Sequence, residues 1–148
     1  MKAIVTGASS GIGATTVREL SAANYEVLAI ARRQDRLAEL EDRHNIRTVS
    51  ADVRDIARLE REFEDFAPDL LINNAGVGHG IAGLSNLDPK IVQEAIDINI
   101  TALVQLTGAV LPGMLNRGRG HIVNIGSISG TQTAEAPCVR YGRKPFEF

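Results

Sequence analysis

The feature that most constrains this chain is a glycine-rich octapeptide, TGASSGIG, at residues 6–13. It follows a short β-branched segment at residues 2–6 and precedes Val17 and Leu20, which have helical spacing. A strand that enters a helix through glycines leaves backbone N–H groups pointing outward, where the helix dipole favours an anion. The glycines are needed because a Cβ would block the close approach of a pyrophosphate. We therefore predict a phosphate-binding turn, and the alternative is a tight strand-to-helix turn without a ligand.

The alternation of strand and helix continues along the chain. Apolar segments predict further strands at 25–30, 46–50, 69–72 and 121–125, and amphipathic patterns predict helices at 35–44, 54–66 and about 89–116, the last bending near Asn99. This order predicts a parallel sheet with right-handed crossovers, buried on both faces. The expected fold class is α/β, a doubly wound parallel sheet in one domain over residues 1–148. With five strands where about six are usual, we expect the sheet to be incomplete at its C-terminal side.

Composition excludes several other classes of protein. A chain of 148 residues with a net charge of −2 makes nucleic acid a poor partner. A lone cysteine, Cys138, excludes an internal disulfide framework, and the dispersed histidines disfavour a metal site. Polar residues interrupt the apolar stretch at 91–115, so we expect a buried helix and no membrane span. The N-terminal residues lack a secretory pattern, which favours the cytoplasm.

Four motifs in a fixed order make the sequence resemble the short-chain dehydrogenase/reductase family. They are TGASSGIG at 6–13, NNAG at 73–76, Asn99 within DINI, and VNIGS ending at Ser127. The resemblance implies a Rossmann-like fold and hydride transfer between a nicotinamide cofactor and a small carbonyl or alcohol substrate. Together with the glycine turn it nominates as cofactor-binding residues Gly7, Ser9, Ser10, Gly11, Ile12, Gly13, Arg32, Arg33, Asp52, Val53, Asn74, Ala75 and Gly76.

The end of the second predicted strand indicates which cofactor is bound. A carboxylate there would accept from the ribose 2′-hydroxyl, but this chain has Arg32 and Arg33 and no acid. Guanidinium groups pair well with phosphate, so we favour NADP(H) over NAD(H). The alternative is that both arginines belong to a solvated helix start. The resemblance puts Asp52 beside the adenine ring, whereas Asp52 could instead be a helix N-cap. It puts Asn73 in a structural network, with cofactor contact as an equal alternative.

The resemblance also implies the catalytic residues. Ser127 would orient the substrate oxygen, Tyr141 would give or take the proton, Asn99 would hold a water, and Lys144 would lower the tyrosine pKa. The family spacing Y-x-x-x-K is broken, because lysine follows Tyr141 by three residues and Pro145 occupies the expected lysine position.

Three explanations of this departure from the family spacing stay open: the chain is a fragment, a frameshift occurred near residue 140, or the sequence is misread there. The departure also leaves a second function open, a catalytically impaired cofactor-binding module that acts as a sensor or interaction protein. Residues 78–84 and 129–133 are expected to line the near side of a substrate pocket. The helix at 91–115 is apolar around much of its circumference, which predicts a homo-oligomer, a dimer or a tetramer.

Overall fold

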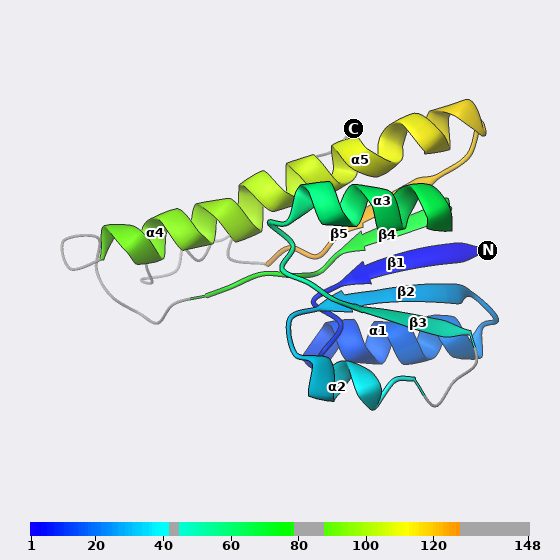
Figure 1. Ribbon diagram of the computed structural model, residues 1–148, viewed down its shortest axis with the longest axis horizontal. Helices are drawn as coiled ribbons and strands as arrows, with labels where there is room; N and C mark the ends of the chain where they lie inside the picture. The colour runs from blue at the N-terminus through cyan, green and yellow to red at the C-terminus, as the bar shows by residue number, and fades with distance from the viewer. Residues whose placement is uncertain (42–44, 79–87, 128–148) are drawn as a thin grey trace.

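A computed structural model of the chain describes residues 1–41, 45–78 and 88–127. Five parallel strands form one sheet in the order β3-β2-β1-β4-β5 (Figure 1). The strands are β1 (Lys2–Thr6), β2 (Glu26–Ala31), β3 (Ile46–Ser50), β4 (Leu70–Asn73) and β5 (His121–Asn124). The helices are α1 (Gly11–Ala22), α2 (Gln34–Ala38), α3 (Ile56–Phe66), α4 (Pro89–Ile96) and α5 (Leu103–Asn116), with the π-helical segment η2 (Asp97–Ala102) joining α4 to α5.

The sheet is covered on both faces, as the apolar strands predicted. Figure 1 shows α1 and α2 on one side and α3 with the long helix α4–η2–α5 on the other. Because successive side chains of a strand point to opposite faces, Ile4 packs in the core beneath α3 and α5, and Val5 packs in the core beneath α1 and α2. The doubly wound fold is therefore confirmed.

The strand order reverses at β1, which pairs with β2 on one side and with β4 on the other. In such a sheet the crossovers on either side of the first strand run to opposite faces. A crevice then opens beyond the carboxyl ends of the strands at this point. The glycine turn at 6–13 leaves β1 at this position, so the fold places the predicted phosphate-binding turn at the crevice.

One helix is shorter than predicted, and another is irregular where a bend was predicted. The helix predicted at 35–44 is wrong over residues 39–41, because the N–H of Leu40 bonds to the carbonyl of Leu37 and that of Glu41 to the carbonyl of Ala38; residues 42–44 lie outside the described residues. These tighter turns end α2 and bury Leu40. At Asn99, where a bend was predicted, the structure has η2, a wider helical turn between the α-helices α4 and α5; the bend itself stays a prediction.

The helical run Pro89–Asn116 is long and apolar enough to cross a membrane by length and composition, and about a third of its most apolar window is buried in the fold. Its sheet-facing side places Leu106, Val110 and Met114 in the core with α3. The packing is that of a core helix in a doubly wound domain. The opposite side leaves Val104 and Leu115 exposed.

Candidate cofactor-binding site

The turn between β1 and α1 is built from glycines for steric reasons that the structure makes explicit. Gly7 and Gly11 have φ values of 66° and 53°, which L-residues with a Cβ rarely adopt. A Cβ on Gly13 would lie 2.3 Å from the carbonyl oxygen of Gly7 and 2.4 Å from Nδ2 of Asn74. Gly13 therefore lets the helix pack closely against the turn, and Gly11 faces open space at the helix start.

The start of α1 is suited to an anion. Its first turn carries backbone N–H groups without intrahelical acceptors, as every helix start does. Ser10 occupies the N-cap position, and its side chain makes no capping hydrogen bond within the helix. Because Gly11 also leaves the space in front of the helix open, the residues present fit a phosphate group.

Asn74 and Thr6 fix the turn to the end of β4. Nδ2 of Asn74 donates to the carbonyl oxygens of Thr6 (2.9 Å) and Gly7 (3.2 Å). Thr6 Oγ1 accepts from the backbone N–H groups of Asn74 (3.0 Å) and Ala75 (2.9 Å). The bonds hold two chain segments 68 residues apart side by side. The NNAG motif thus sets the geometry of the turn as well as lining the crevice.

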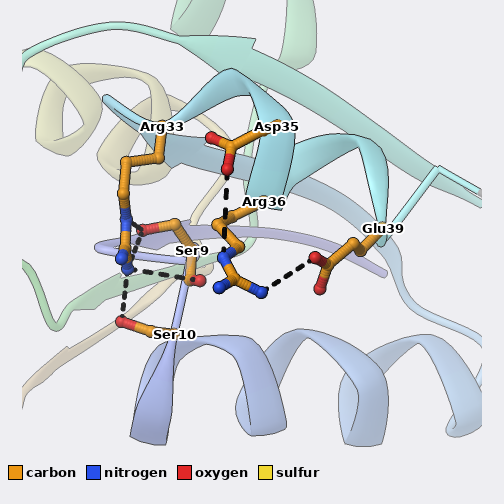
Figure 2. A network of polar contacts seen from close by, with 6 residues as sticks. All are labelled: Ser9, Ser10, Arg33, Asp35, Arg36 and Glu39. Carbon is orange, nitrogen blue, oxygen red and sulfur yellow. Dashed lines mark hydrogen bonds and ion pairs between the residues drawn. The ribbon is translucent and has the colours of Figure 1, made fainter.

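Arg33 lies across the same turn (Figure 2). Its Nη2 donates to Ser10 Oγ at 2.8 Å and to Ser9 Oγ at 3.0 Å, and its Nε donates to Ser9 Oγ at 3.2 Å. Arg36, one helical turn further on, pairs instead with carboxylates, at 2.9 Å from Glu39 and 3.9 Å from Asp35. Within the described part of the chain Arg33 has no carboxylate partner, so its positive charge is not neutralised.

Arg32 points to a different partner. Its Nη1 lies 4.0 Å from Oδ2 of Asp52, which follows β3. The Arg54 guanidinium, hydrogen-bonded to Asp52, holds the pKa of that carboxyl below its usual value. Helix α3 begins at Ile56 with Asp55 at its N-cap position, so the alternative reading of Asp52 as the helix N-cap is wrong.

A cavity of about 450 Å³ opens at the carboxyl ends of β1 to β4, where these groups meet. Its lining includes ten of the predicted cofactor-binding residues: Gly7, Ser9, Ser10, Arg32, Arg33, Asp52, Val53, Asn74, Ala75 and Gly76. The remaining three, Gly11, Ile12 and Gly13, form the first turn of α1 beside it. Val77 and Ile98 also line the cavity, and sequence reasoning missed both.

Asn99 and Ser127 are the two proposed catalytic residues within the described residues. Asn99 is 5% exposed, and its side chain pairs with the backbone of Val77, accepting from N–H at 2.9 Å and donating to the carbonyl at 3.0 Å. The contact anchors η2 to the segment after β4 that lines the cavity, while the predicted water-holding role stays a prediction. Ser127 is exposed just after β5. Tyr141 and Lys144 lie outside the described residues, as do residues 129–133 and 79–84 of the expected substrate pocket.

Of the two roles left open for Asn73, structural support and cofactor contact, the structure favours the first. Asn73 is 2% exposed, and its Nδ2 donates to Thr107 Oγ1 at 3.1 Å and to Asn124 Oδ1 at 2.9 Å. These bonds join β4 to β5 and to α5. The described residues contain no cluster of three or more His, Cys, Asp or Glu side chains that could hold a metal ion.

Known proteins share both the sequence pattern and the fold. The family model for short chain dehydrogenase matches residues 1–142. NADP-dependent 3-hydroxy acid dehydrogenase YdfG of Escherichia coli K12 is 38% identical over 138 residues, which cover 88% of this chain and 56% of that protein. A probable NADP-dependent dehydrogenase of Haemophilus influenzae is 38% identical over 151 residues, covering 97% of this chain and 60% of that protein.

A solved structure of a dehydrogenase has the same fold as this chain. The closed form of serine dehydrogenase complexed with NADP⁺ superposes with a TM-score of 0.87 at 36% identity, over 92% of this chain and 58% of that one. The chain thus spans somewhat more than half the length of the relatives that it matches. The order of the motifs, the doubly wound sheet and the match over residues 1–142 agree: this chain belongs to the short-chain dehydrogenase family.

Proposed function

We propose that this chain binds NADP(H) and belongs to an enzyme that interconverts a small alcohol and its carbonyl compound. One observation carries the choice of cofactor. Arg33 is held over the glycine turn by Ser9 and Ser10, and within the described residues no carboxylate neutralises it. A guanidinium group in this position suits the 2′-phosphate that distinguishes NADP from NAD. The relatives named above as NADP-dependent support the same choice.

The cavity offers each part of the dinucleotide a suitable surface. The start of α1, with Gly11 and Ile12, would hold the pyrophosphate through backbone N–H groups. Arg33 and Ser9 would hold the 2′-phosphate, and Asp52 with Val53 would lie along the base. Asn74, Ala75 and Gly76 would line the path toward β5 and Ser127.

The nicotinamide group supplies the hydride when it is bound. Ser127 would donate a hydrogen bond to the substrate oxygen, and Tyr141 would transfer the proton to or from it. Lys144 would favour the tyrosinate, while Asn99 would hold a water molecule and keep η2 against Val77. A carboxylate with a hydroxyl group on its third carbon is the first substrate class to test, because relatives are named for a 3-hydroxy acid and for serine.

A direct test is to titrate the 148-residue chain with NADPH and with NADH and follow the nicotinamide fluorescence. We expect NADPH to bind at least about tenfold more tightly, because a charge-assisted bond to the 2′-phosphate contributes about 1.5 kcal/mol or more. Equal affinities would refute the assignment of Arg33 to the 2′-phosphate. Turnover of serine and 3-hydroxybutyrate with NADP⁺ tests the enzymatic part.

A second function, cofactor binding without catalysis, is favoured by one sequence observation. Lys144 follows Tyr141 by three residues and Pro145 by four, which departs from the family spacing. This function predicts tight NADPH binding without turnover of any hydroxy acid. Insertion of one residue between Tyr141 and Lys144 would restore the spacing, and recovered turnover in that variant would favour the enzyme.

We further propose self-association through the outer face of the long helix. Four large apolar side chains are exposed there: Ile96, Val104, Leu111 and Leu115. Exposed apolar groups along one helix suit a second copy of the same helix. Sedimentation should give a dimer or tetramer for the wild-type chain and a smaller species for Val104→Glu. A cytoplasmic location stays a prediction, to be checked by cell fractionation.

A further inference from the structure

We propose that Arg54 is a positioning residue for the cofactor site. The family resemblance already puts Asp52 beside the adenine ring, and Arg54 would hold its carboxylate in the orientation that accepts from the amino group of the base. The inference rests on the proposed NADP(H) function. Arg54 itself does not line the cavity, so its effect would pass through Asp52.

Three hydrogen bonds join Arg54 to Asp52, which lies two positions earlier in the chain. Arg54 Nε donates to Oδ1 of Asp52 at 2.9 Å, and Nη2 donates to Oδ2 at 2.7 Å. The backbone N–H of Arg54 also donates to Oδ1, at 3.0 Å. Three bonds from one residue fix both torsions of the short aspartate side chain, so the carboxylate has one orientation before any ligand arrives.

The bonds leave one part of the carboxylate available. Among the residues that the structure describes, Oδ1 accepts two hydrogen bonds, both from Arg54, and Oδ2 accepts one. The nearest nitrogen of Arg32 is 4.0 Å from Oδ2, too far for a hydrogen bond. An ionised carboxylate oxygen has room for a second donor. Oδ2 can therefore accept a hydrogen bond from a ligand while all three bonds from Arg54 remain in place.

The position of Asp52 indicates which part of a dinucleotide it meets. The phosphate-binding turn follows β1, and Arg33 follows β2, where the adenosine ribose of a doubly wound fold lies. Asp52 follows β3, one strand further from the turn, and its side chain is 27% exposed in the cavity wall. The base is the part of the cofactor beyond the ribose on this side.

Arg54 also keeps Asp52 in the form that such recognition needs. Its hydrogen bonds lower the pKa of the Asp52 carboxyl, so the group is ionised and accepts without donating. On its other side Arg54 faces acidic residues of the long helix, Glu94 and Asp97, whose charges add to that of Asp52 in raising the pKa of Arg54. An acceptor-only group favours the 6-amino group of adenine over the 6-oxo group of hypoxanthine.

The test is a double-mutant cycle on NADPH affinity in the 148-residue chain, with Arg54→Gln, Asp52→Ala and both together. We expect Arg54→Gln to weaken NADPH binding about fivefold, since an oriented charge-assisted bond is partly lost. In the Asp52→Ala background the same change should have no further effect. Arg54→Lys should recover part of the loss, and Arg61→Gln, an exposed arginine on α3, is the matched control.

A second measurement does not depend on the folded fraction of a variant. The ratio of affinities for NADPH and its hypoxanthine analogue should exceed one in the wild-type chain and fall toward one in Arg54→Gln. An unchanged ratio, equal weakening in both Asp52 backgrounds, or tighter NADPH binding by Arg54→Gln would each overturn the inference, the last because Arg54 would then compete with the base. A wild-type chain without NADPH affinity would instead overturn the proposed function, and this inference with it.

Discussion

We call the end of the sheet where the parallel strands begin its N-terminal edge. Asp69 lies there, is 7% exposed, and accepts hydrogen bonds from donors of its own chain. The backbone N–H of Lys2 donates to its Oδ2 at 3.0 Å, and Arg119 Nε donates to its Oδ1 at 3.1 Å. At the opposite edge, Arg33 is bonded to serine hydroxyls beside an open cavity. Both edges use arginine at the end of a strand or helix, and the partners differ.

The difference separates stabilising charges from binding charges. The Asp69 carboxylate and the Arg119 guanidinium neutralise each other and join the starts of β1, β4 and β5. The two serines orient Arg33 without neutralising it, which leaves its charge to act on a ligand. Changes at the N-terminal edge should therefore alter the free energy of unfolding, and changes at the other edge should alter cofactor affinity.

The largest expected effect lies in the glycine turn, where one residue affects both the free energy of unfolding and cofactor affinity. Gly13→Ala should lower the free energy of unfolding by about 3 kcal/mol, because its Cβ overlaps backbone and amide atoms that cannot withdraw. Chemical denaturation measures this change, and NADPH titration should show lost affinity as well. Gly108→Ala is the control, because a Cβ there meets nothing within 4 Å. Equal stability of both variants would contradict the packing of the turn.

At the N-terminal edge we expect an effect on stability alone. Asp69→Ala should lower the free energy of unfolding by about 2 kcal/mol, since the N–H of Lys2 loses its buried acceptor and Arg119 its counter-charge. The NADPH affinity of the folded fraction should not change. Asp65→Ala, on the exposed face of α3, is the matched control. A weaker cofactor affinity in Asp69→Ala would break the separation between the two edges.

At the cavity edge the expected pattern is reversed. Arg33→Ala should weaken NADPH binding about tenfold, a loss of about 1.4 kcal/mol, and leave NADH binding and the melting temperature nearly unchanged. Arg36→Ala is the control, because Arg36 is already paired with Glu39 and Asp35. Equal losses for both cofactors would show that Arg33 contributes to the turn and not to phosphate recognition.

Acid should produce the smallest effect. The N–H of Lys2, and secondarily Arg119, holds the pKa of the Asp69 carboxyl below its unfolded value, and Arg54 does the same for Asp52. A lowered folded-state pKa gives stability that is complete above the unfolded pKa, about 4, and is lost as pH falls through the folded pKa. Denaturation midpoints from pH 6 downward should fall less in Asp69→Asn than in the wild-type chain. Parallel curves would show that Asp69 carries no linked proton.

Much of this arrangement could be predicted from local sequence. Glycines at 7, 11 and 13 point to a phosphate-binding turn because only backbone geometry is involved. The apolar strands predicted burial on both faces, and the helical pattern predicted a bend near Asn99, where the structure has the wider turn η2. Local bonds ended α2 earlier than the apolar spacing indicated.

The long arginine side chains could not be placed in the same way. Arg32 and Arg33 are adjacent in sequence, yet one approaches Asp52 and the other bonds Ser9 and Ser10, because the partners come from separate strands. Their roles depend on strand order, which spacing alone does not give. The sequence held one clue to the contact between Asp52 and Arg54. An aspartate side chain often accepts from the backbone N–H two residues further on, as Asp52 does from Arg54.

The π-helical segment Asp97–Ala102 adds one more residue to the long helix than a regular α-helix of that length would hold. Two core residues lie within this segment, Ile98 and Ala102, and three more follow in α5 at the same four-residue spacing: Leu106, Val110 and Met114. Residues four apart in a regular α-helix differ by about 40° around its axis, and the wider turn reduces this difference between Ile98 and Ala102. Removing one residue here would force a choice between keeping these core residues inside and keeping Asn99 opposite Val77. The wider turn thus lets neighbouring residues serve two purposes, with Ile98 in the core and Asn99 bonded to the cavity wall.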